Sequence, residues 1–361
     1  MRRVPSDFAP KTILVIQLRQ IGDVLMTTPA LRALRRRYPQ ARIMYLAEPL
    51  PAKVLEGNPV IDEVIIRDPS GGILEPLQTI SKIRARRPDL VIDFLANPRA
   101  TMIAFLSGAK VTLTYADNRR AIFYSHTVRA EGMFSGAQKF SLLRALGVKP
   151  DSETMDLDMP VPEAARDKIA QWFALAGLES APRPLVCLEP FQKWPALTYP
   201  PEGFVKICEL MREKWGGTVI VCWGPGKEEA ARRIVEDAKA LLVLAPPTDL
   251  HELAALYQRA DLWVGVDCGP RHIAAAQGVP TFAVLGPSGD AWTPPGPRHL
   301  SVYRDDLECL PCDRRTCIEG HHDCMEKFPP EDVFKKLEEF WRRVERLENT
   351  RPLTKSVAKG R

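Results

Sequence analysis

Residues 11–23 read KTILVIQLRQIGD, and this stretch decides the fold. Its first eight residues form a mainly apolar run, which predicts a strand buried on both faces of a parallel sheet. Gly22 then permits a tight turn, and residues 24–38 carry apolar side chains at helical spacing with arginines on the outer face. The order of strand, glycine turn and helix predicts the first half of a βαβ unit in an α/β fold.

The same alternation continues along the chain in two series. Strand-like runs follow at residues 42–47, 63–67, 89–95 and 110–115, and a proline-punctuated polar stretch at 148–162 predicts a linker. The second series has strand-like runs at 184–188, 217–223, 261–266 and 281–285, with helices at 201–214, 227–240, around Ile273 and at 330–347. We therefore expect two doubly wound, Rossmann-like domains, residues 1–160 and 161–347, facing each other across a cleft, and a disordered tail at 348–361.

Composition narrows the class of protein. The 361 residues are 45% hydrophobic and 26% charged, as in soluble globular proteins, and the formal net charge of +5 is too small to predict nucleic acid as a partner. No apolar run approaches the ~20 residues of a membrane span, and residues 13–18 are too short for a secretory signal. Three of the eight cysteines lie inside apolar runs, which favours a reducing, cytoplasmic compartment.

Asp23 stands where the first buried strand passes into a helix. A carboxylate there often caps the helix, because it accepts hydrogen bonds from free backbone N–H groups. The alternative places Asp23 on the floor of the cleft, where it accepts a proton from a substrate hydroxyl. Position alone leaves both interpretations open.

A second strand, turn and helix junction reads GVDCGPRH at residues 265–272. Gly269 lets backbone N–H groups approach a ligand, and the helix start attracts anions. A neighbouring turn at Gly286 suits the second phosphate of a diphosphate. His272 is either a core histidine or, one turn into this helix, a ligand of the anion.

A third turn follows the strand at 217–223, in the segment CWGPGKEE at residues 222–229. Glu228 there is either a solvated carboxylate at a helix start or a bidentate acceptor for ribose hydroxyls.

With these motifs in view, the chain resembles the ADP-heptose:lipopolysaccharide heptosyltransferases, inverting enzymes of the GT-B fold. The resemblance rests on ILVIQLRQIGDVLMTTPALRALRRRYPQARI at residues 13–43 and WVGVDCGPRHIAAAQGVPTFAVLGPSGDAW at 263–292. Shorter agreements at NPVIDEVI, CWGPGKEE and the cysteine-bearing region extend it to about residue 347. The variant at residues 18–23 is most similar to the heptosyltransferase III type.

The resemblance implies transfer of heptose from ADP-heptose to the inner core of lipopolysaccharide, with inversion. It implies that Asp23 is the catalytic base and that Asp267, Gly269 and His272 bind the donor diphosphate and sugar. Glu228 would contact the donor nucleoside. Preorganised N–H groups would stabilise the leaving diphosphate, so that catalysis needs no divalent metal.

Two positions depart from the family pattern. Cys268 replaces the threonine that the family often has between the aspartate and the glycine, so a weak thiol replaces a hydroxyl donor. The family lysine falls on Leu197. Lys193 is the nearest cation, and whether it takes the place of that lysine beside the diphosphate is open.

Four cysteines near the end of the second series, Cys309, Cys312, Cys317 and Cys324, have spacings compatible with tetrahedral zinc. A structural zinc and a set of plain thiols are equally open interpretations.

Basic residues gather in the first half of the chain, where the resemblance implies that the acceptor binds. Charge runs usually form a solvated helix face. The alternative is peripheral contact with the anionic inner leaflet of the inner membrane. The candidate contacts are Arg35, Arg36, Arg37, Arg42, Arg84, Arg86 and Arg87.

Two other functions fit the same architecture. One is a GT-B glycosyltransferase that uses another nucleotide sugar, which donor competition separates from the first. The other is a non-catalytic nucleotide-sugar binding protein, which shows no turnover.

Overall fold

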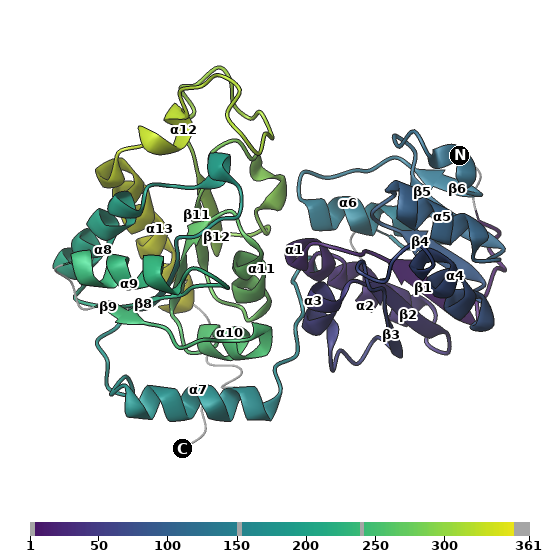
Figure 1. The fold of residues 1–361 in the computed structure, drawn as a ribbon, viewed down its shortest axis with the longest axis horizontal. Helices are drawn as coiled ribbons and strands as arrows, with labels where there is room; N and C mark the ends of the chain where they lie inside the picture. Colours follow the sequence, from purple (N-terminus) through teal and green to yellow (C-terminus); the bar gives the residue numbers. More distant parts are fainter. Residues whose placement is uncertain (1–3, 150–153, 239–241, 350–361) are drawn as a thin grey trace.

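The computed structural model describes residues 4–149, 154–238 and 242–349, and its ribbon forms two α/β units side by side (Figure 1). The first unit contains a parallel sheet in the order β3-β2-β1-β4-β5-β6. Its strands are β1 Thr12–Ile16, β2 Arg42–Ala47, β3 Glu63–Ile66, β4 Leu90–Asp93, β5 Val111–Tyr115 and β6 His126–Val128.

The second unit repeats this design with a parallel sheet in the order β12-β11-β10-β7-β8-β9. Its strands are β7 Leu185–Glu189, β8 Thr218–Val221, β9 Leu242–Leu244, β10 Leu262–Val266, β11 Thr281–Val284 and β12 His299–Val302. Strand order reverses beside β1 in the first sheet and beside β7 and β10 in the second. The doubly wound fold expected from the sequence is confirmed.

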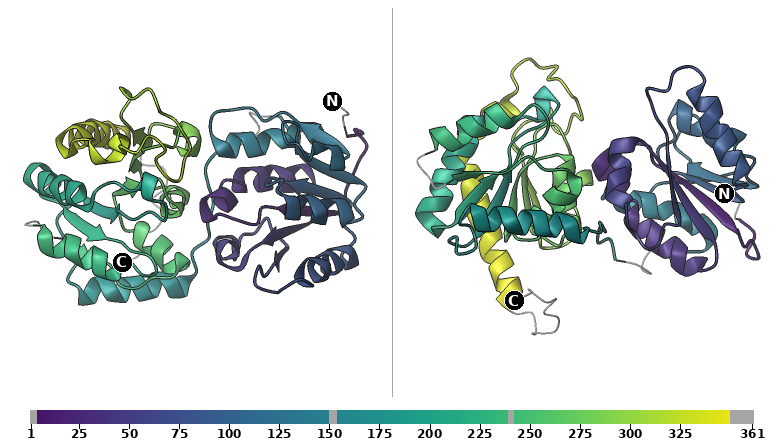
Figure 2. Two further views of the ribbon diagram at one scale, coloured as in Figure 1. Left: turned by 45° about the horizontal axis from the view of Figure 1, so that its top comes forward. Right: turned by 60° about the horizontal axis from the view of Figure 1, so that its bottom comes forward.

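Helices cover both faces of each sheet (Figure 2). The first unit has α1 Ile21–Leu25, α2 Thr28–Arg37, α3 Pro49–Ala52, α4 Glu75–Ala85, α5 Pro98–Leu106 and α6 Ser135–Ser141. The second has α7 Glu163–Leu175, α8 Pro201–Trp215, α9 Glu228–Asp237, α10 Leu250–Tyr257, α11 Gly269–Ala276, α12 Asp323–Glu326 and α13 Pro330–Asn349. None of these helices is both long enough and apolar enough to cross a membrane.

The single helix predicted at residues 24–38 is wrong, because the structure divides it into α1 and α2. Pro29 has no N–H to donate to the carbonyl of Leu25. The hydroxyl of Thr28 donates to that carbonyl instead, at 2.7 Å. The short helix α1 thus ends at Leu25, and α2 begins separately at Thr28, with Pro29 in its first turn.

The prediction also missed several elements. Among them are three strands at sheet edges, β6, β9 and β12, and two helices, α7 and α10. The last helix, α13, continues to Asn349, two residues into the predicted tail, and residues 350–361 of that tail lie outside the described part of the chain. The domain boundary at residue 160 stays a prediction.

The carboxyl ends of β1 and β10 bring α1 and α11 against each other where the two units meet (Figure 1). A side-chain carbon built on Gly269 would lie 3.4 Å from the Cβ atom of Ile21. The turns that follow β1 and β10 therefore face each other directly, and they carry the residues singled out in the sequence.

Candidate active site

Asp23 occupies the first turn of α1, directly after β1. Its Oδ2 atom accepts a long hydrogen bond from the backbone N–H of Gln20, at 3.4 Å. The capping contact expected of a carboxylate at this position is therefore present. The Oδ1 atom makes a different contact, which the sequence did not indicate.

Lys139 of α6 donates from Nζ to Oδ1 of Asp23 at 3.0 Å and to the hydroxyl of Ser135 at 2.9 Å. The lysine is only 5% exposed. The two residues are 116 positions apart in the chain. No local pattern links them, so only the folded structure identifies this cation.

The turn after β10 faces Asp23 from the second unit. Cys268 is the extended residue before α11, and Gly269 and Pro270 open the helix. His272, one turn further, lies against Gly22: a Cβ atom built on Gly22 would be 2.4 Å from Cδ2 of His272. The absence of a side chain at Gly22 is what allows the imidazole to approach α1.

His272 is almost fully buried, and its Nδ1 atom has no hydrogen-bond partner. Burial lowers the pKa of His272 to about 3, and the positive charges of Arg271, Lys139 and His299 add to this effect. The imidazole is therefore neutral at physiological pH. A neutral imidazole has one ring N–H to donate in a hydrogen bond.

Asp267 directly follows β10 and begins the same turn, where it is half-buried. Burial raises the pKa of its carboxyl, against the opposing effects of Arg271 and of a hydrogen bond from Ser288, and the charge of Asp23 raises it further. The side-chain amide of Gln192 donates to the backbone carbonyl of Asp267. Asp267 is thus tied to the turns after β7 and β11 and lies within electrostatic range of Asp23.

Cys268 is the residue at which the chain departs from the family threonine. Burial raises the pKa of its thiol well above the usual range, and the charge of Glu189 adds to the rise. The thiol stays protonated and offers at most a weak donor.

Gly286 follows β11 and is closely packed against neighbouring residues. A Cβ atom there would lie 2.7 Å from the side chain of Met325 and 3.1 Å from the carbonyl oxygen of Ala196. The turns after β7 and β11 therefore touch each other, and both also contact Asp267, through Gln192 and Ser288. The diphosphate site expected at the turns of Gly269 and Gly286 stays a prediction.

Lys193 belongs to the turn after β7. Its Nζ atom lies 5.0 Å from the centroid of the Trp194 ring, and the guanidinium carbon of Arg315 lies 4.2 Å from the same centroid. Leu197, at the position of the family lysine, is in the same turn. The structure therefore places two cations close to the position where the family lysine is missing.

Glu228 is not brought into contact with these turns. It is the exposed first residue of α9 and forms an ion pair with Arg232 on its own helix, at 3.0 Å. The structure shows the surface carboxylate at a helix start that was one of the two expectations for this position.

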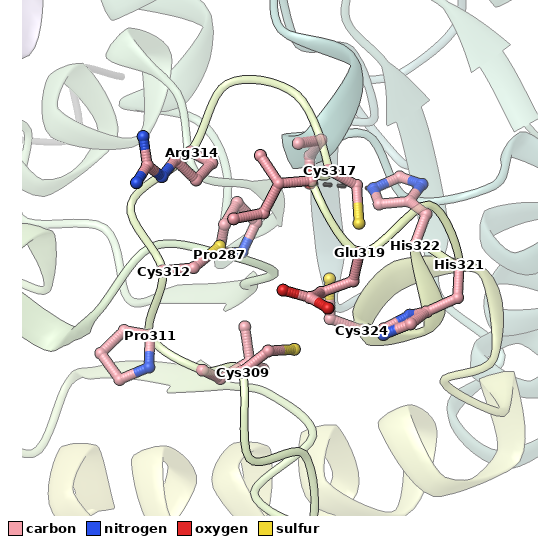
Figure 3. Close-up of a pocket in the computed structure, with 13 residues that line it drawn as sticks. Pro287, Cys309, Pro311, Cys312, Arg314, Cys317, Glu319, His321, His322 and Cys324 are labelled. Carbon is pink, nitrogen blue, oxygen red and sulfur yellow. Dashed lines mark hydrogen bonds between the residues drawn. The ribbon is translucent and has the colours of Figure 1, made fainter.

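The four clustered cysteines line a cavity of about 280 Å³ together with Glu319, His321 and His322 (Figure 3). All four are free thiols. Backbone N–H groups, first that of His322, lower the pKa of Cys317, whereas burial raises that of Cys324 to about 11. Within the described ranges, no three cysteine, histidine or acidic side chains are gathered closely enough to hold a metal ion.

This cysteine segment, residues 309–324, packs on the turns of the site. The backbone N–H of Asp313 donates to the carbonyl of Pro287 at 3.0 Å, and that of Ala196 to the carbonyl of Arg315 at 3.3 Å. A ring nitrogen of His322 lies 3.0 Å from the carbonyl oxygen of Ala196. The segment thus holds the turns after β7 and β11 in place through these hydrogen bonds.

Comparison with known proteins agrees with this architecture. The model of glycosyltransferase family 9 (heptosyltransferase) matches residues 77–322, more than half of the chain. The chain belongs to this family. It is therefore a glycosyltransferase with the GT-B fold, and the resemblance stated from the motifs is confirmed.

Relatives match over nearly the full chain. Lipopolysaccharide heptosyltransferase 3 of Escherichia coli (strain K12) is 25% identical over 336 residues, which cover 89% of this chain and 95% of that protein. A family 9 glycosyltransferase structure from Veillonella parvula DSM 2008 has a TM-score of 0.82 at 26% identity, over 93% of this chain and 98% of the other. An E. coli heptosyltransferase solved with ADP-2-deoxy-2-fluoro heptose shares the fold, with a TM-score of 0.70 at 19% identity over 91% of this chain and 99% of the other.

Proposed function

We propose that this glycosyltransferase moves heptose from ADP-heptose to the inner core of lipopolysaccharide, with inversion at the anomeric carbon and Asp23 as the general base. The observation that carries the proposal is the direct approach of α1, whose first turn holds Asp23, to the helix start at Gly269 of α11. The names of the family and of relatives such as lipopolysaccharide heptosyltransferase 3 support the donor and acceptor classes.

In this mechanism, Asp23 accepts the proton of an acceptor hydroxyl as its oxygen attacks the anomeric carbon. A bond forms between that oxygen and the carbon, and the bond from the carbon to the diphosphate oxygen breaks on the opposite face. ADP leaves with the bonding electrons. Attack and departure on opposite faces produce the inversion.

The turns of the second unit stabilise the negative charge that develops on the diphosphate. Backbone N–H groups at Gly269 and Gly286 donate to it, and the helix start of α11 adds its positive end. The neutral imidazole of His272 donates a hydrogen bond. Asp267 and Cys268 shape the same turn, and Asp267 accepts from sugar hydroxyls.

Lys193 supplies the positive charge that Leu197 cannot. Rotation of its flexible side chain from the ring of Trp194 toward the turn at Gly286 brings the ammonium to the diphosphate. Glu228 contacts the ribose only after releasing Arg232, since that pair occupies its carboxylate.

For the cysteine segment we propose structural zinc. Thiolates and imidazoles are the ligands that zinc prefers, and Cys309, Cys312, Cys317 and Cys324 share one cavity. Because the side chains are not gathered around one point, binding would draw the segment together. No step of the transfer passes through this metal.

We further propose that the protein contacts the inner membrane surface through the first unit. The arginines considered from the sequence lie at the ends of α2 and α4 and at the start of β2, at the amino edge of the sheet, away from Asp23. Arg35 forms an ion pair with Asp62, and Arg42 and Arg86 both pair with Glu63.

Exposed apolar side chains of the first unit are better placed for this membrane contact than the arginines are. An apolar rim of Leu50, Ile66, Ile73, Leu74 and Leu77 lies at the carboxyl edge, because α3 and α4 begin where β2 and β3 end. This is the edge that carries Asp23. Contact through the rim sets the site close to an acceptor whose lipid tail is in the bilayer.

Product analysis tests the proposed function. The purified protein is incubated with ADP-heptose and a panel of truncated lipopolysaccharides, with UDP-sugars as competitors. We expect ADP release, one added heptose on one acceptor of the panel and no competition by UDP-sugars. Turnover of a UDP-sugar instead would assign another donor, and binding without turnover would make the protein a nucleotide-sugar binder.

A further inference from the structure

Lys139 carries a charged side chain that is almost wholly buried next to Asp23 of the proposed site. Lysine is rarely buried unless it is paired, because transfer of its ammonium from water into the protein interior costs several kcal/mol. Its hydrogen bonds to Asp23 and Ser135 account for two of its three donors. The pair is therefore a built feature of the interior, not a surface ion pair.

The position of this lysine follows from the element that carries it. α6 begins at Ser135 and packs against α2, and from this helix Lys139 reaches Asp23 in the first turn of α1. Figure 1 shows α6 next to α1, where the two units meet. Its charge also extends to His272, where it contributes to the lowered pKa of that imidazole.

The two oxygens of Asp23 have different surroundings. Oδ1 is held by Lys139 at 3.0 Å, whereas within the described residues Oδ2 accepts only the long hydrogen bond from the backbone of Gln20, at 3.4 Å. About a quarter of the Asp23 side chain is exposed (23%), against 6% for the lysine. Lys139 thus holds one oxygen of a partly exposed carboxylate firmly, and the other oxygen has a weaker contact.

We propose that Lys139 is a positioning residue for Asp23. It fixes the carboxylate through Oδ1, so that Oδ2 faces the acceptor hydroxyl. This inference rests on the proposed function, because it gives Lys139 a role only if Asp23 is the base.

A double-mutant cycle tests this role. We measure kcat, the donor KM and ADP affinity for Lys139→Met, Asp23→Asn and the double variant. Lys139→Met is expected to lower kcat by about 10- to 100-fold, since a carboxylate held less firmly reaches the acceptor less often. Donor KM and ADP affinity stay within twofold. In the Asp23→Asn background the same change adds less than about twofold, because both residues act through one carboxylate.

Conservative and matched variants separate positioning from folding. Lys139→Arg keeps a cation that reaches the carboxylate and restores part of the kcat, and Ser135→Ala gives a smaller loss in the same direction. Lys168→Met removes a lysine that pairs with Glu252 at the surface, at 2.6 Å, and leaves kcat unchanged. If Lys139→Met misfolds, the arginine and alanine variants still decide the question.

Three results would overturn the inference: wild-type kcat for Lys139→Met, a loss that multiplies fully with that of Asp23→Asn, or no recovery by arginine together with no loss in Ser135→Ala. Wild-type turnover of Asp23→Asn is a different outcome. It would remove the proposed base itself and show that the mechanism, not only the role of Lys139, is wrong.

Discussion

Among single residues, Gly22 shows how one missing side chain joins the two units. An added methyl group there would meet the ring of His272 at 2.4 Å. We predict that Gly22→Ala lowers turnover by about 10- to 100-fold, because α1 and α11 must move apart and Asp23 moves with α1. Steady-state kinetics measure this. Gly224→Ala is the control, since its new methyl group meets nothing within 4 Å. Equal activity of the two variants would contradict the close approach.

Glu189 is a second single-residue case, at the end of β7. It is buried, with one hydrogen bond from the hydroxyl of Tyr257 at 3.2 Å, and burial raises its pKa to about 7 from a usual 4.5. The folded state therefore keeps a proton that the unfolded state releases as pH rises from about 4.5 to about 7. This carboxyl lowers stability across that window, by roughly 3 kcal/mol.

Glu189→Gln is accordingly expected to remove this part of the pH dependence of unfolding. Denaturant melts at pH 4.5 to 8 measure it, with Glu236→Gln on the exposed face of α9 as the control. An unchanged slope in Glu189→Gln would show that the carboxyl is ionised in the folded protein.

The site residues differ in how far the sequence could predict them. Asp23, Asp267 and Gly269 each follow a buried strand, and this position alone indicates a site at the carboxyl edge of a sheet. Lys139 could not be found in this way, because its partner is far along the chain and α6 carries no motif. Glu228 also begins a helix after a buried strand, which is the local pattern of a site residue. Its carboxylate nevertheless pairs with Arg232 on the same helix.

At the scale of elements, central strands were the easiest to predict. β1, β7 and β10 are buried on both faces and appear as continuous apolar runs. The edge strands β6, β9 and β12 have three or four residues and partly exposed patterns, so no run marks them. The break between α1 and α2 depends on Pro29 and on a threonine hydroxyl, which outweigh the helical spacing of the apolar residues.

The cysteine segment is the element whose chemistry is most directly testable. We predict about one zinc per chain in untagged, reduced protein, measured by elemental analysis, and its loss in Cys317→Ser. ADP affinity falls with the metal, because the segment contacts Ala196 and Pro287. Cys208→Ala, on α8 and outside the cluster, is the control. Metal-free wild-type protein would leave a set of plain thiols.

At the scale of the whole molecule, the apolar rim determines which face meets the membrane. We predict that Ile73→Ser with Leu74→Ser weakens binding to anionic phospholipid vesicles by roughly tenfold or more, since each buried CH₂ contributes about 0.8 kcal/mol. Vesicle co-sedimentation measures it, and turnover on a delipidated acceptor stays unchanged. Leu175→Ser, in the second unit and 89% exposed before the change, is the control. Equal binding of both variants would contradict the proposed face.

The central claim is that two facing turns, one from each unit, perform the transfer, with Asp23 removing the proton. Its most direct test is Asp23→Asn, with ADP-heptose turnover and ADP affinity measured on the same preparation. The account predicts a fall in turnover of about 100-fold or more, the usual contribution of a general base, with ADP affinity within twofold of the original protein. Turnover close to that of the original protein, at unchanged ADP affinity, would contradict it.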